Sequence, residues 1–450
     1  MDNSINKEKE KRIKMDLSIK SNQSLILCFA VTGIITAGLF VPYFNLVALV
    51  VIAWGFVRFS SEEVLCILCF TLSFSPIFKL QIGGFTLFNV VLILAVICSL
   101  IKKRFMLPYR VCLLIWIFGM YEFIISFSTN IIECVTVLLS LLLMGLLYNP
   151  QQCEYNLKKI NTFTIWGLII TSVLALFDDL IPRIGYLTAQ TTIRLSAGEY
   201  YYRFSGLMEN PNYYTIMLSI VLSILCILMI QGKAKLLDYI YFIVLSIFGF
   251  MSVSQSFIVT FVVMILLLLI SYARTKPRKL LGIILILIIM TYVIYMFLDA
   301  STIETILFRM GEIDVDGSDV SELTSGRAEL WLYYLKYLSS NLGVLLLGRG
   351  IGASNLPMGA SHSYYIDMLY HLGIVGTILY ILLLIKLFGN VNSRFKRTNV
   401  YQYLPWAIFL IRGMARNLIA SEQLVFMLLL CSLSVLNINK DSYDLIREKG

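Results

Sequence analysis

The chain has 450 residues, of which 59% are hydrophobic and 14% are charged, and its mean hydropathy is +0.83. This composition excludes a water-soluble globular protein and indicates a multi-pass membrane protein. Apolar runs close to the roughly 20 residues that cross a bilayer recur along the chain, which predicts helical spans rather than a membrane barrel. The net charge of +9 lies largely in basic loops that suit anionic lipid, so it does not indicate a nucleic-acid partner.

Residues 1–24 carry six basic and four acidic side chains without an apolar core or cleavage site, which predicts a cytoplasmic tail. A transmembrane domain is predicted over 25–437 and a second cytoplasmic tail over 438–450. The domain is expected to be an all-α bundle of about 12–14 spans. The predicted spans are 25–41, 43–57, 64–78, 86–101, 110–128, 131–148, 161–177, 213–230, 237–252, 256–272, 280–298, 362–388, 401–417 and 422–437.

Lysine and arginine concentrate in alternate loops, which is the signature of cytoplasmic segments. These basic segments are the N-terminal tail and residues 102–104, 158–159, 233–235, 274–279 and 394–397. The number of predicted spans between them is even each time, so both termini are expected in the cytoplasm. The two longest loops, about 178–212 and 299–361, are then predicted to lie on the outer side.

The cysteines do not indicate a disulfide framework, because eight of the nine lie in apolar spans and Cys153 lies in a cytoplasmic loop. Cys66 and Cys69 form a CxxC inside an apolar helix, where packing is a better explanation than metal or redox chemistry. The chain has no Walker loop, GxGxxG unit or internal repeat. No cofactor and no metal are therefore predicted.

The two outer loops contain arginine almost to the exclusion of lysine. Their arginines are Arg183, Arg194, Arg203, Arg309, Arg327 and Arg349, against the single Lys336. A guanidinium group presents a planar fork that matches phosphate or carboxylate oxygens, which a lysine does not. The bias favours an anionic ligand, and the alternative is that these arginines pair with acidic residues of the same loops.

The first outer loop ends in "RFSGLMENPN", which predicts a sharp turn before the next span. Gly206 permits the turn, Asn210 and Pro211 interrupt the chain, and Asn212 is predicted to cap a helix that begins at 213. Arg203 is thereby expected near a helix N-terminus, whose free N–H groups and dipole favour anions.

The second outer loop contains one ordered segment, "SGRAELWLYYLKYLSS". Ser325 is a suitable cap, and the apolar side chains recur with helical spacing, which predicts an interfacial helix along the bilayer surface. The predicted apolar face consists of Leu330, Trp331, Tyr334, Leu335 and Leu338. Arg327 falls in the first turn, and the glycine-rich segment 348–355 is predicted to form a flexible approach to His362.

His362 is one of two histidines and opens the predicted span 362–388 at its outer end. An imidazole that water and substrate can reach is suited to accept a proton from an attacking hydroxyl, and the alternative is a capping or interfacial role. His371 lies nine residues further, on the opposite helix face, so the two histidines are not expected to share a metal. His371 is predicted to pair with Asp367 as a structural residue.

A further polar cluster lies in the turn between the last two predicted spans, where Arg412, Arg416, Glu422 and Gln423 occur together. Arginine within a membrane is costly, which predicts a cavity or an anionic partner. The alternative is that both arginines extend toward lipid headgroups.

Five segments carry a resemblance when they are taken in order: "RFSGLMENPN", "SVSQS", "SGRAELW", "LLLGRGIG" and "SHSYYIDMLYHLGIVG". Over roughly residues 200–380 the chain resembles the O-antigen polymerase and O-antigen ligase family. The resemblance implies a helical membrane bundle of the C-type glycosyltransferase kind that acts on undecaprenyl-diphosphate-linked glycans. It matches Arg203 and Arg327 to arginines that engage the diphosphate and His362 to a histidine implicated in catalysis, although Ser363 stands where the family often has Asn.

The resemblance therefore implies a polymerase that joins lipid-linked repeat units on the outer face of the bacterial cytoplasmic membrane. Its candidate catalytic residue is His362, its candidate substrate-binding residues are Arg203, Arg327, Arg194, Arg349, Arg183, Arg412 and Arg416, and Gly206, Asn210, Pro211 and Asn212 shape the turn. The expected partners are lipid-linked oligosaccharides, the bilayer and, as a further candidate, a chain-length regulator. An O-antigen ligase with a lipid A core acceptor is the first alternative, and a lipid-linked oligosaccharide flippase or other transporter is the second.

Overall fold

The computed structural model describes most of the chain. The described residues are 23–78, 87–102, 109–127, 131–148, 155–181, 183–184, 192–194, 200–208, 210–275, 277–298, 300–311, 327–353, 361–388, 400–414, 418–419, 421 and 423–447. Within these ranges the protein is helical except for one short antiparallel hairpin, in which β1 (Thr192–Arg194) pairs with β2 (Tyr200–Tyr202).

The helices follow one another with short connections. After a first helix over Gln23–Phe40, the N-terminal half contains α2 (Phe44–Arg58), α3 (Ser61–Thr71), the 3-10 turn η1 (Leu72–Phe74), α4 (Ser75–Phe78), α5 (Leu87–Ile101), α6 (Tyr109–Ser126), α7 (Ile131–Leu147) and α8 (Leu157–Ala175). The C-terminal half contains α10 (Pro211–Gln231), α11 (Leu236–Met251), α12 (Gln255–Thr275), α13 (Pro277–Phe297), α14 (Ala300–Gly311), α16 (Arg327–Ser340), α17 (Leu342–Leu347), α18 (Tyr364–Phe388), the 3-10 turn η2 (Val400–Tyr403), α19 (Leu404–Gly413) and α20 (Gln423–Arg447).

Within the described residues each predicted span contains helix, which confirms the all-α, multi-pass membrane architecture. Six helices in the described ranges are long and apolar enough to cross a membrane, and five shorter apolar helices accompany them. The bounds differ most at the C-terminal end, where α20 continues to Arg447 although the predicted span ends at 437. Its helical continuation occupies most of the predicted C-terminal tail.

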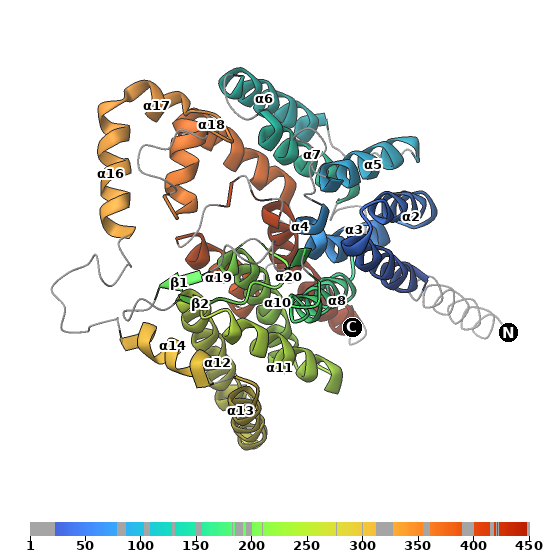
Figure 1. Ribbon diagram of the computed structural model, residues 1–450, viewed down its shortest axis with the longest axis vertical. Helices are drawn as coiled ribbons and strands as arrows, with labels where there is room; N and C mark the ends of the chain where they lie inside the picture. Colours follow the sequence, from blue (N-terminus) through green and yellow to red (C-terminus); the bar gives the residue numbers. More distant parts are fainter. Residues whose placement is uncertain are drawn as a thin grey trace.

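Helix α10 lies at the centre of the bundle and contacts α8, α11, α12, α19 and α20 (Figure 1). Its sequence is apolar on every side, which is the pattern of a helix surrounded by other helices. The hydroxyl groups of Thr215 and Ser219 donate to carbonyl groups of the preceding turn, so these buried polar side chains are satisfied within the helix. A helix packed on all sides in this way holds the residues at its ends in fixed positions.

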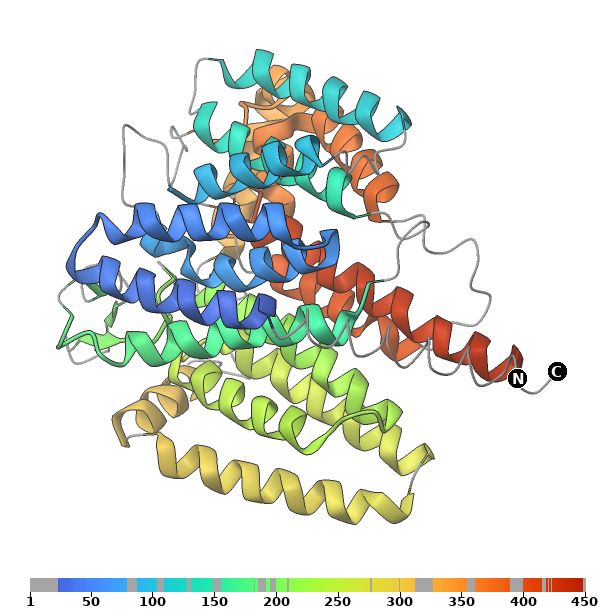
Figure 2. The same ribbon diagram turned by 90° about the vertical axis from the view of Figure 1, so that its right-hand side faces the viewer.

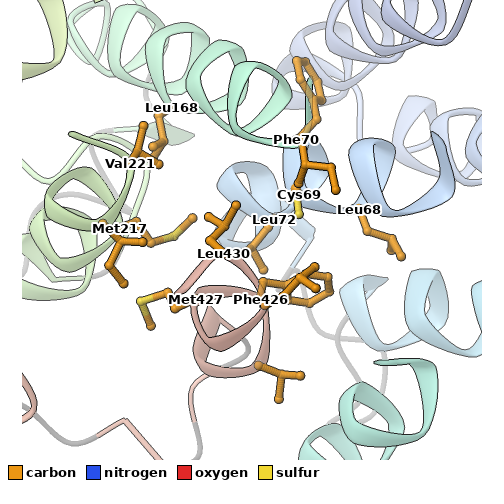
Figure 3. Packing of buried hydrophobic residues seen from close by; sticks show 14 of the residues in the cluster. Leu68, Cys69, Phe70, Leu72, Leu168, Met217, Val221, Phe426, Met427 and Leu430 are labelled. Carbon is orange, nitrogen blue, oxygen red and sulfur yellow. The ribbon is translucent and has the colours of Figure 1, made fainter. Parts of the chain in front are cut away.

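The main core packs α10 against α3, α8 and α20 (Figure 3). Met217 and Val221 of α10 face Leu430 of α20 and Leu168 of α8. Cys69 is 1% exposed within this cluster, so the predicted packing role for the CxxC segment fits its position. The eight cysteines in the described ranges are all free thiols.

Different segments of the chain lie at the two ends of the bundle. Figure 2 shows the β1–β2 hairpin and α14 at one end and the C-terminal end of α20 at the other. Helix α16 lies across the direction of α10 and α13 (Figure 1), as expected for a helix at a membrane surface. This arrangement agrees with the prediction that the long arginine-bearing loops and the C-terminus lie on opposite sides.

Helix α16 is held by a second, smaller cluster. Tyr334 and Leu338 are buried against Ile366 and Tyr370 of α18, whereas Leu335 of the predicted apolar face is 49% exposed. Helix α18 itself is interrupted at Gly373, whose φ of 63° and ψ of −176° are not helical. The predicted span 362–388 is therefore two helical pieces, and the first of them packs on α16.

Candidate active site

The N-terminus of α10 is shaped by the turn that precedes it. Gly206 has a φ of +57°, and a Cβ at this position would lie 3.0 Å from the Tyr214 ring, which confirms the predicted glycine turn. The prediction of Asn212 as the N-cap is wrong by two residues: Asn210 is the N-cap and accepts a bond of 2.9 Å from the Asn212 N–H. Pro211 takes the first helical position, where its missing N–H is no loss. The Asn212 side chain is thereby released for other contacts.

Arg203 is half-buried and is held against the turn between α11 and α12. Its Nε donates to the Ser252 carbonyl over 3.0 Å, and Nη2 donates to Asn212 Oδ1 over 3.5 Å. Ser254 Oγ donates to the same Asn212 oxygen over 3.0 Å. Val253, between the two serines, has a φ of +49°, which is rare for a β-branched residue and occurs where the surroundings impose it.

Arg412 lies at the end of α19 and is 1% exposed. Its two Nη atoms donate to Ser256 Oγ, to Thr215 Oγ1 and, over 3.2 Å, to the Asn212 carbonyl. The buried Nε has no hydrogen-bond partner in the part of the chain that the structure describes. Arg412 is therefore a buried cation whose hydrogen-bond partners there are all neutral oxygens.

Three guanidinium groups converge at this point. Arg203 and Arg412 share Asn212, whose side-chain oxygen accepts from Arg203 and whose carbonyl accepts from Arg412. The charge of Arg327, the first residue of α16, also acts on Arg412. Each of the three arginines comes from a different part of the fold. Burial disfavours a charged group, and the fold nevertheless places several positive charges together here. Bringing like charges together in a low dielectric is unfavourable unless an anion offsets them, and this cluster is the feature of the molecule best suited to bind one.

His362 lies immediately before α18 and not in its first turn as predicted. The residue has a φ of +54°, and the helix begins two residues later at Tyr364. Ser361 caps the helix start: its Oγ accepts from the Ser363 N–H over 3.1 Å and donates to Asp367 Oδ1 over 2.6 Å. Because the backbone leaves the helical path at His362, its side chain follows neither helix face, and the predicted opposite facing of the two histidines does not apply.

The residues on both sides of His362 contact the helices that carry two of the arginines. Trp331, one turn along α16 from Arg327, donates from Nε1 to the Ser361 carbonyl over 3.0 Å. The Tyr365 hydroxyl donates to the Leu410 carbonyl of α19 over 2.8 Å, one turn before the end that carries Arg412. His362 is thus fastened between α16 and α19, and it is partly exposed.

Two of the other predicted arginines, Arg183 and Arg349, bind elsewhere in the described part of the chain. Arg183 donates from Nη1 to the Gly38 carbonyl over 3.3 Å. Arg349 is exposed and donates to the Tyr337 hydroxyl over 2.9 Å, a hydrogen bond that raises the pKa of Arg349 and keeps it charged. Arg194 lies on β1 opposite Tyr200, in the hairpin that leads to Arg203. Arg416 and Glu422 lie outside the described residues.

His371 and Asp367 do not have the partners expected of them. His371 Nδ1 donates to the Gly350 carbonyl over 2.9 Å, and Asp367 Oδ1 accepts from Ser361. The glycine-rich segment predicted to be flexible is bonded at Arg349, Gly350 and Ile351 to α18 and α6. Backbone groups buried in a membrane protein have to be satisfied within the protein, which explains why this segment is fastened.

Sequence reasoning missed the hydroxyl residues of the site. Thr215 and Ser256 bind Arg412, and the Ser252 carbonyl binds Arg203. The available signal was a run of small hydroxyl residues, "SVSQS", at the very start of a span that otherwise has few polar residues. Hydroxyl groups at a helix start are so often local caps that the pattern does not by itself reveal a distant arginine.

Comparison with known families matches residues 240–381 to the model described as O-antigen ligase. These residues run from α11 into α18 and include Arg327, Arg349 and His362. Over these residues the chain is similar to the O-antigen ligase family. No curated protein and no solved structure matched the chain in the corresponding searches.

Members of the O-antigen polymerase and ligase family are glycosyltransferase-like membrane enzymes, and the apolar helices of this chain agree with that setting. The matched segment supplies one arginine of the cluster and the histidine. Arg203 precedes the matched segment and Arg412 follows it, so the site combines the family segment with two flanking parts of the chain.

Proposed function

We propose that the protein is a surface-polysaccharide polymerase that joins undecaprenyl-diphosphate-linked oligosaccharide units. It acts on the outer face of the bacterial cytoplasmic membrane, with both termini in the cytoplasm. The donor is the lipid diphosphate itself, so no nucleotide sugar takes part. The transmembrane domain over 25–437 carries the whole activity.

The grouping of Arg203 and Arg412 around Asn212 carries this proposal, and Arg327 adds a third positive charge that acts on Arg412. A lipid diphosphate brings two adjacent phosphates to the membrane surface, and guanidinium groups bind phosphate oxygens with charge-assisted hydrogen bonds. Arg412 has neutral partners in the described ranges, so a diphosphate nearby would offset its charge. A neutral glycan or a nucleobase would not.

The chemistry follows from these positions. A terminal hydroxyl of one glycan attacks the anomeric carbon of another, and the bond from that carbon to the diphosphate oxygen breaks. His362 accepts the hydroxyl proton, and the arginines stabilise the negative charge that develops on the departing undecaprenyl diphosphate. The exposure of His362 next to Ser361 and Trp331 gives both substrates access to its imidazole.

The test uses the purified full-length protein and synthetic polyprenyl-diphosphate oligosaccharide. His362→Ala is expected to insert and express as the parent does but to elongate about a hundredfold to ten-thousandfold more slowly. Elongation at the parent rate with the same pH profile would contradict the role of His362. The base would then have to be sought elsewhere, with Glu209, outside the described residues, or a substrate group as the next candidates.

An O-antigen ligase is the second candidate, because the matched family model carries that description. A ligase would use the same donor and would transfer the glycan to a lipid A core. Deletion and complementation distinguishes the two: loss of a polymerase leaves surface glycan of one repeat unit, whereas loss of a ligase leaves long glycan that is unattached. Unattached long glycan in the deletion strain would contradict the polymerase proposal.

A further inference from the structure

The interruption of α18 creates a short helical piece, the outer half-helix, over Tyr364–Leu372. Gly373 ends it with a φ of 63°, and the rest of α18 continues to Phe388. A helix end leaves its last carbonyl groups without helical donors. Inside a membrane protein each of them needs a partner from elsewhere in the fold.

The last carbonyl groups of the outer half-helix have partners in the segment around Gly350, in α6 and in the second piece of α18. The Arg349 N–H donates to the Tyr370 carbonyl over 3.0 Å, and the Gly350 N–H donates to the His371 carbonyl over 2.8 Å. The Tyr121 hydroxyl of α6 lies 2.8 Å from the Leu372 carbonyl and 2.6 Å from the Leu347 carbonyl. Across the break, Thr377 Oγ1 donates to the Met368 carbonyl over 3.2 Å.

The glycine loop, residues 348–352, is itself anchored where it meets the outer half-helix. Its Gly350 carbonyl accepts from His371 Nδ1, and its Ile351 N–H donates to Glu122 Oε2 of α6 over 3.2 Å. A Cβ on Gly350 would lie 2.8 Å from the Ser126 Cα, so only glycine permits this approach. The junction, where the glycine loop meets the inner end of the outer half-helix, is therefore contacted by two consecutive residues of α6, Tyr121 and Glu122.

The opposite end of the outer half-helix carries His362. Ser361 caps that end, and its carbonyl is bound by Trp331. With its inner end held by α6 and its outer end held by α16, the outer half-helix is fixed as a unit separate from the rest of α18. Its placement decides where the imidazole stands relative to the arginines.

We propose that Tyr121 is a positioning residue that sets the location of His362 through the outer half-helix. This rests on the proposed function, in which His362 is the base. Tyr121 is not part of the arginine cluster: its hydroxyl lies within hydrogen-bond distance of the Leu372 carbonyl, at the inner end of the outer half-helix, and of the Leu347 carbonyl at the end of α17. The reaction depends steeply on the placement of the base, because displacements of about 1 Å cost on the order of a hundredfold in rate.

The experiment compares Tyr121→Phe with Tyr155→Phe in the full-length protein. Tyr155 is a matched control because its buried hydroxyl also donates to a backbone carbonyl, that of Leu147 at the far end of α7, over 2.6 Å. Tyr121→Phe is expected to lower kcat on the order of tenfold and to leave the KM for the lipid donor within about twofold, since the arginines are untouched. Tyr155→Phe is expected to retain the parent kcat. Equal kcat values for the two variants would overturn the proposal.

A double variant separates positioning from general destabilisation. If Tyr121 acts through His362, adding Tyr121→Phe to His362→Ala should lower the residual rate by less than about twofold. A full tenfold further loss would show that Tyr121 acts independently of His362 and would contradict the inference. If His362→Ala alone elongates at the parent rate, the proposed base is refuted instead. Failure of the positioning role of Tyr121 and failure of the proposed function therefore give different results.

Thr377→Val provides a second route if Tyr121→Phe accumulates poorly. It removes one hydroxyl from the same junction without changing side-chain volume, and it should likewise lower kcat, leave the donor KM unchanged and lose its effect in the His362→Ala background. A parent kcat in Thr377→Val with a parent melting temperature would count against the junction as a positioning device.

Discussion

Arg203, Arg327 and Arg412 approach one another from segments far apart in the chain, and their surroundings explain why arginine rather than lysine is present. Arg412 spreads its donors over Ser256, Thr215 and the Asn212 carbonyl, which a single ammonium group does not reach at once. Arg203 likewise divides its donors between two acceptors. The planar guanidinium fork of Arg203 and of Arg412 therefore binds several oxygen atoms of the protein at once.

Replacement by lysine tests this account at the scale of single residues. Arg203→Lys and Arg327→Lys keep the charge but lose the fork, and each is expected to lower the rate about tenfold to a hundredfold. This corresponds to charge-assisted contacts of about 1.5 to 3 kcal/mol made in the transition state. The measurement is elongation by purified protein at matched expression.

Arg183→Lys is the matched control for these two variants, because Arg183 is bound to the Gly38 carbonyl away from the cluster. Its elongation rate is expected to stay close to the parent value. Full activity of both Arg203→Lys and Arg327→Lys would reduce those residues to loop stabilisers.

At the scale of elements, the break in α18 depends on close packing of backbone against backbone. A Cβ on Gly373 would lie 2.6 Å from the Leu346 carbonyl oxygen and closer still to the Gly348 N. The positive φ adds a cost of about 1 to 2 kcal/mol for any residue with a Cβ. The glycine therefore serves both the conformation and the approach of the glycine loop.

Gly373→Ala is accordingly expected to lower the melting temperature of the detergent-solubilised protein markedly and to abolish elongation. Gly282→Ala on α13 is the comparison, because no atom lies within 4 Å of a Cβ there and the residue is helical. This second change should leave activity intact and stabilise the helix by up to about 1 kcal/mol. Similar melting temperatures for the two variants would mean that α18 closes into a regular helix without penalty.

At the scale of the whole molecule, the positive-inside pattern and the fold lead to the same arrangement of the ends. The hairpin that precedes Arg203 lies at the opposite end of the bundle from the terminus of α20 (Figure 2). If the basic loops are cytoplasmic, the arginine cluster faces the outer side of the membrane, as the proposed function requires.

Cysteine labelling checks this orientation. A cysteine introduced at Ser318 should react with an impermeant thiol reagent added to intact cells, and one introduced at Ser393 should react only after the cells are opened. Both positions lie outside the described residues and inside the loops that the charge pattern assigns. The reverse labelling would invert the topology and place the site in the cytoplasm, where nucleotide-sugar donors are available.

The sequence alone determined the membrane setting and the order of the helices, and it supplied the candidate site residues. Hydropathy depends on local composition, so the helices at the predicted spans follow directly from runs of apolar side chains. The bias toward arginine in the outer loops is likewise a local pattern, and the ordered motifs of the resemblance single out Arg203, Arg327 and His362 as candidates.

The tertiary structure decided which of these residues meet. Arg412 meets Arg203 at Asn212, whereas Arg183 and Arg349 bind elsewhere, although the sequence groups all four as candidate substrate-binding residues. Likewise, nothing local separates Gly373 from any other helical glycine. The physical reason is that a buried polar group is satisfied by whichever partner the packing of distant helices brings to it, and neither periodicity nor charge along the chain encodes that partner.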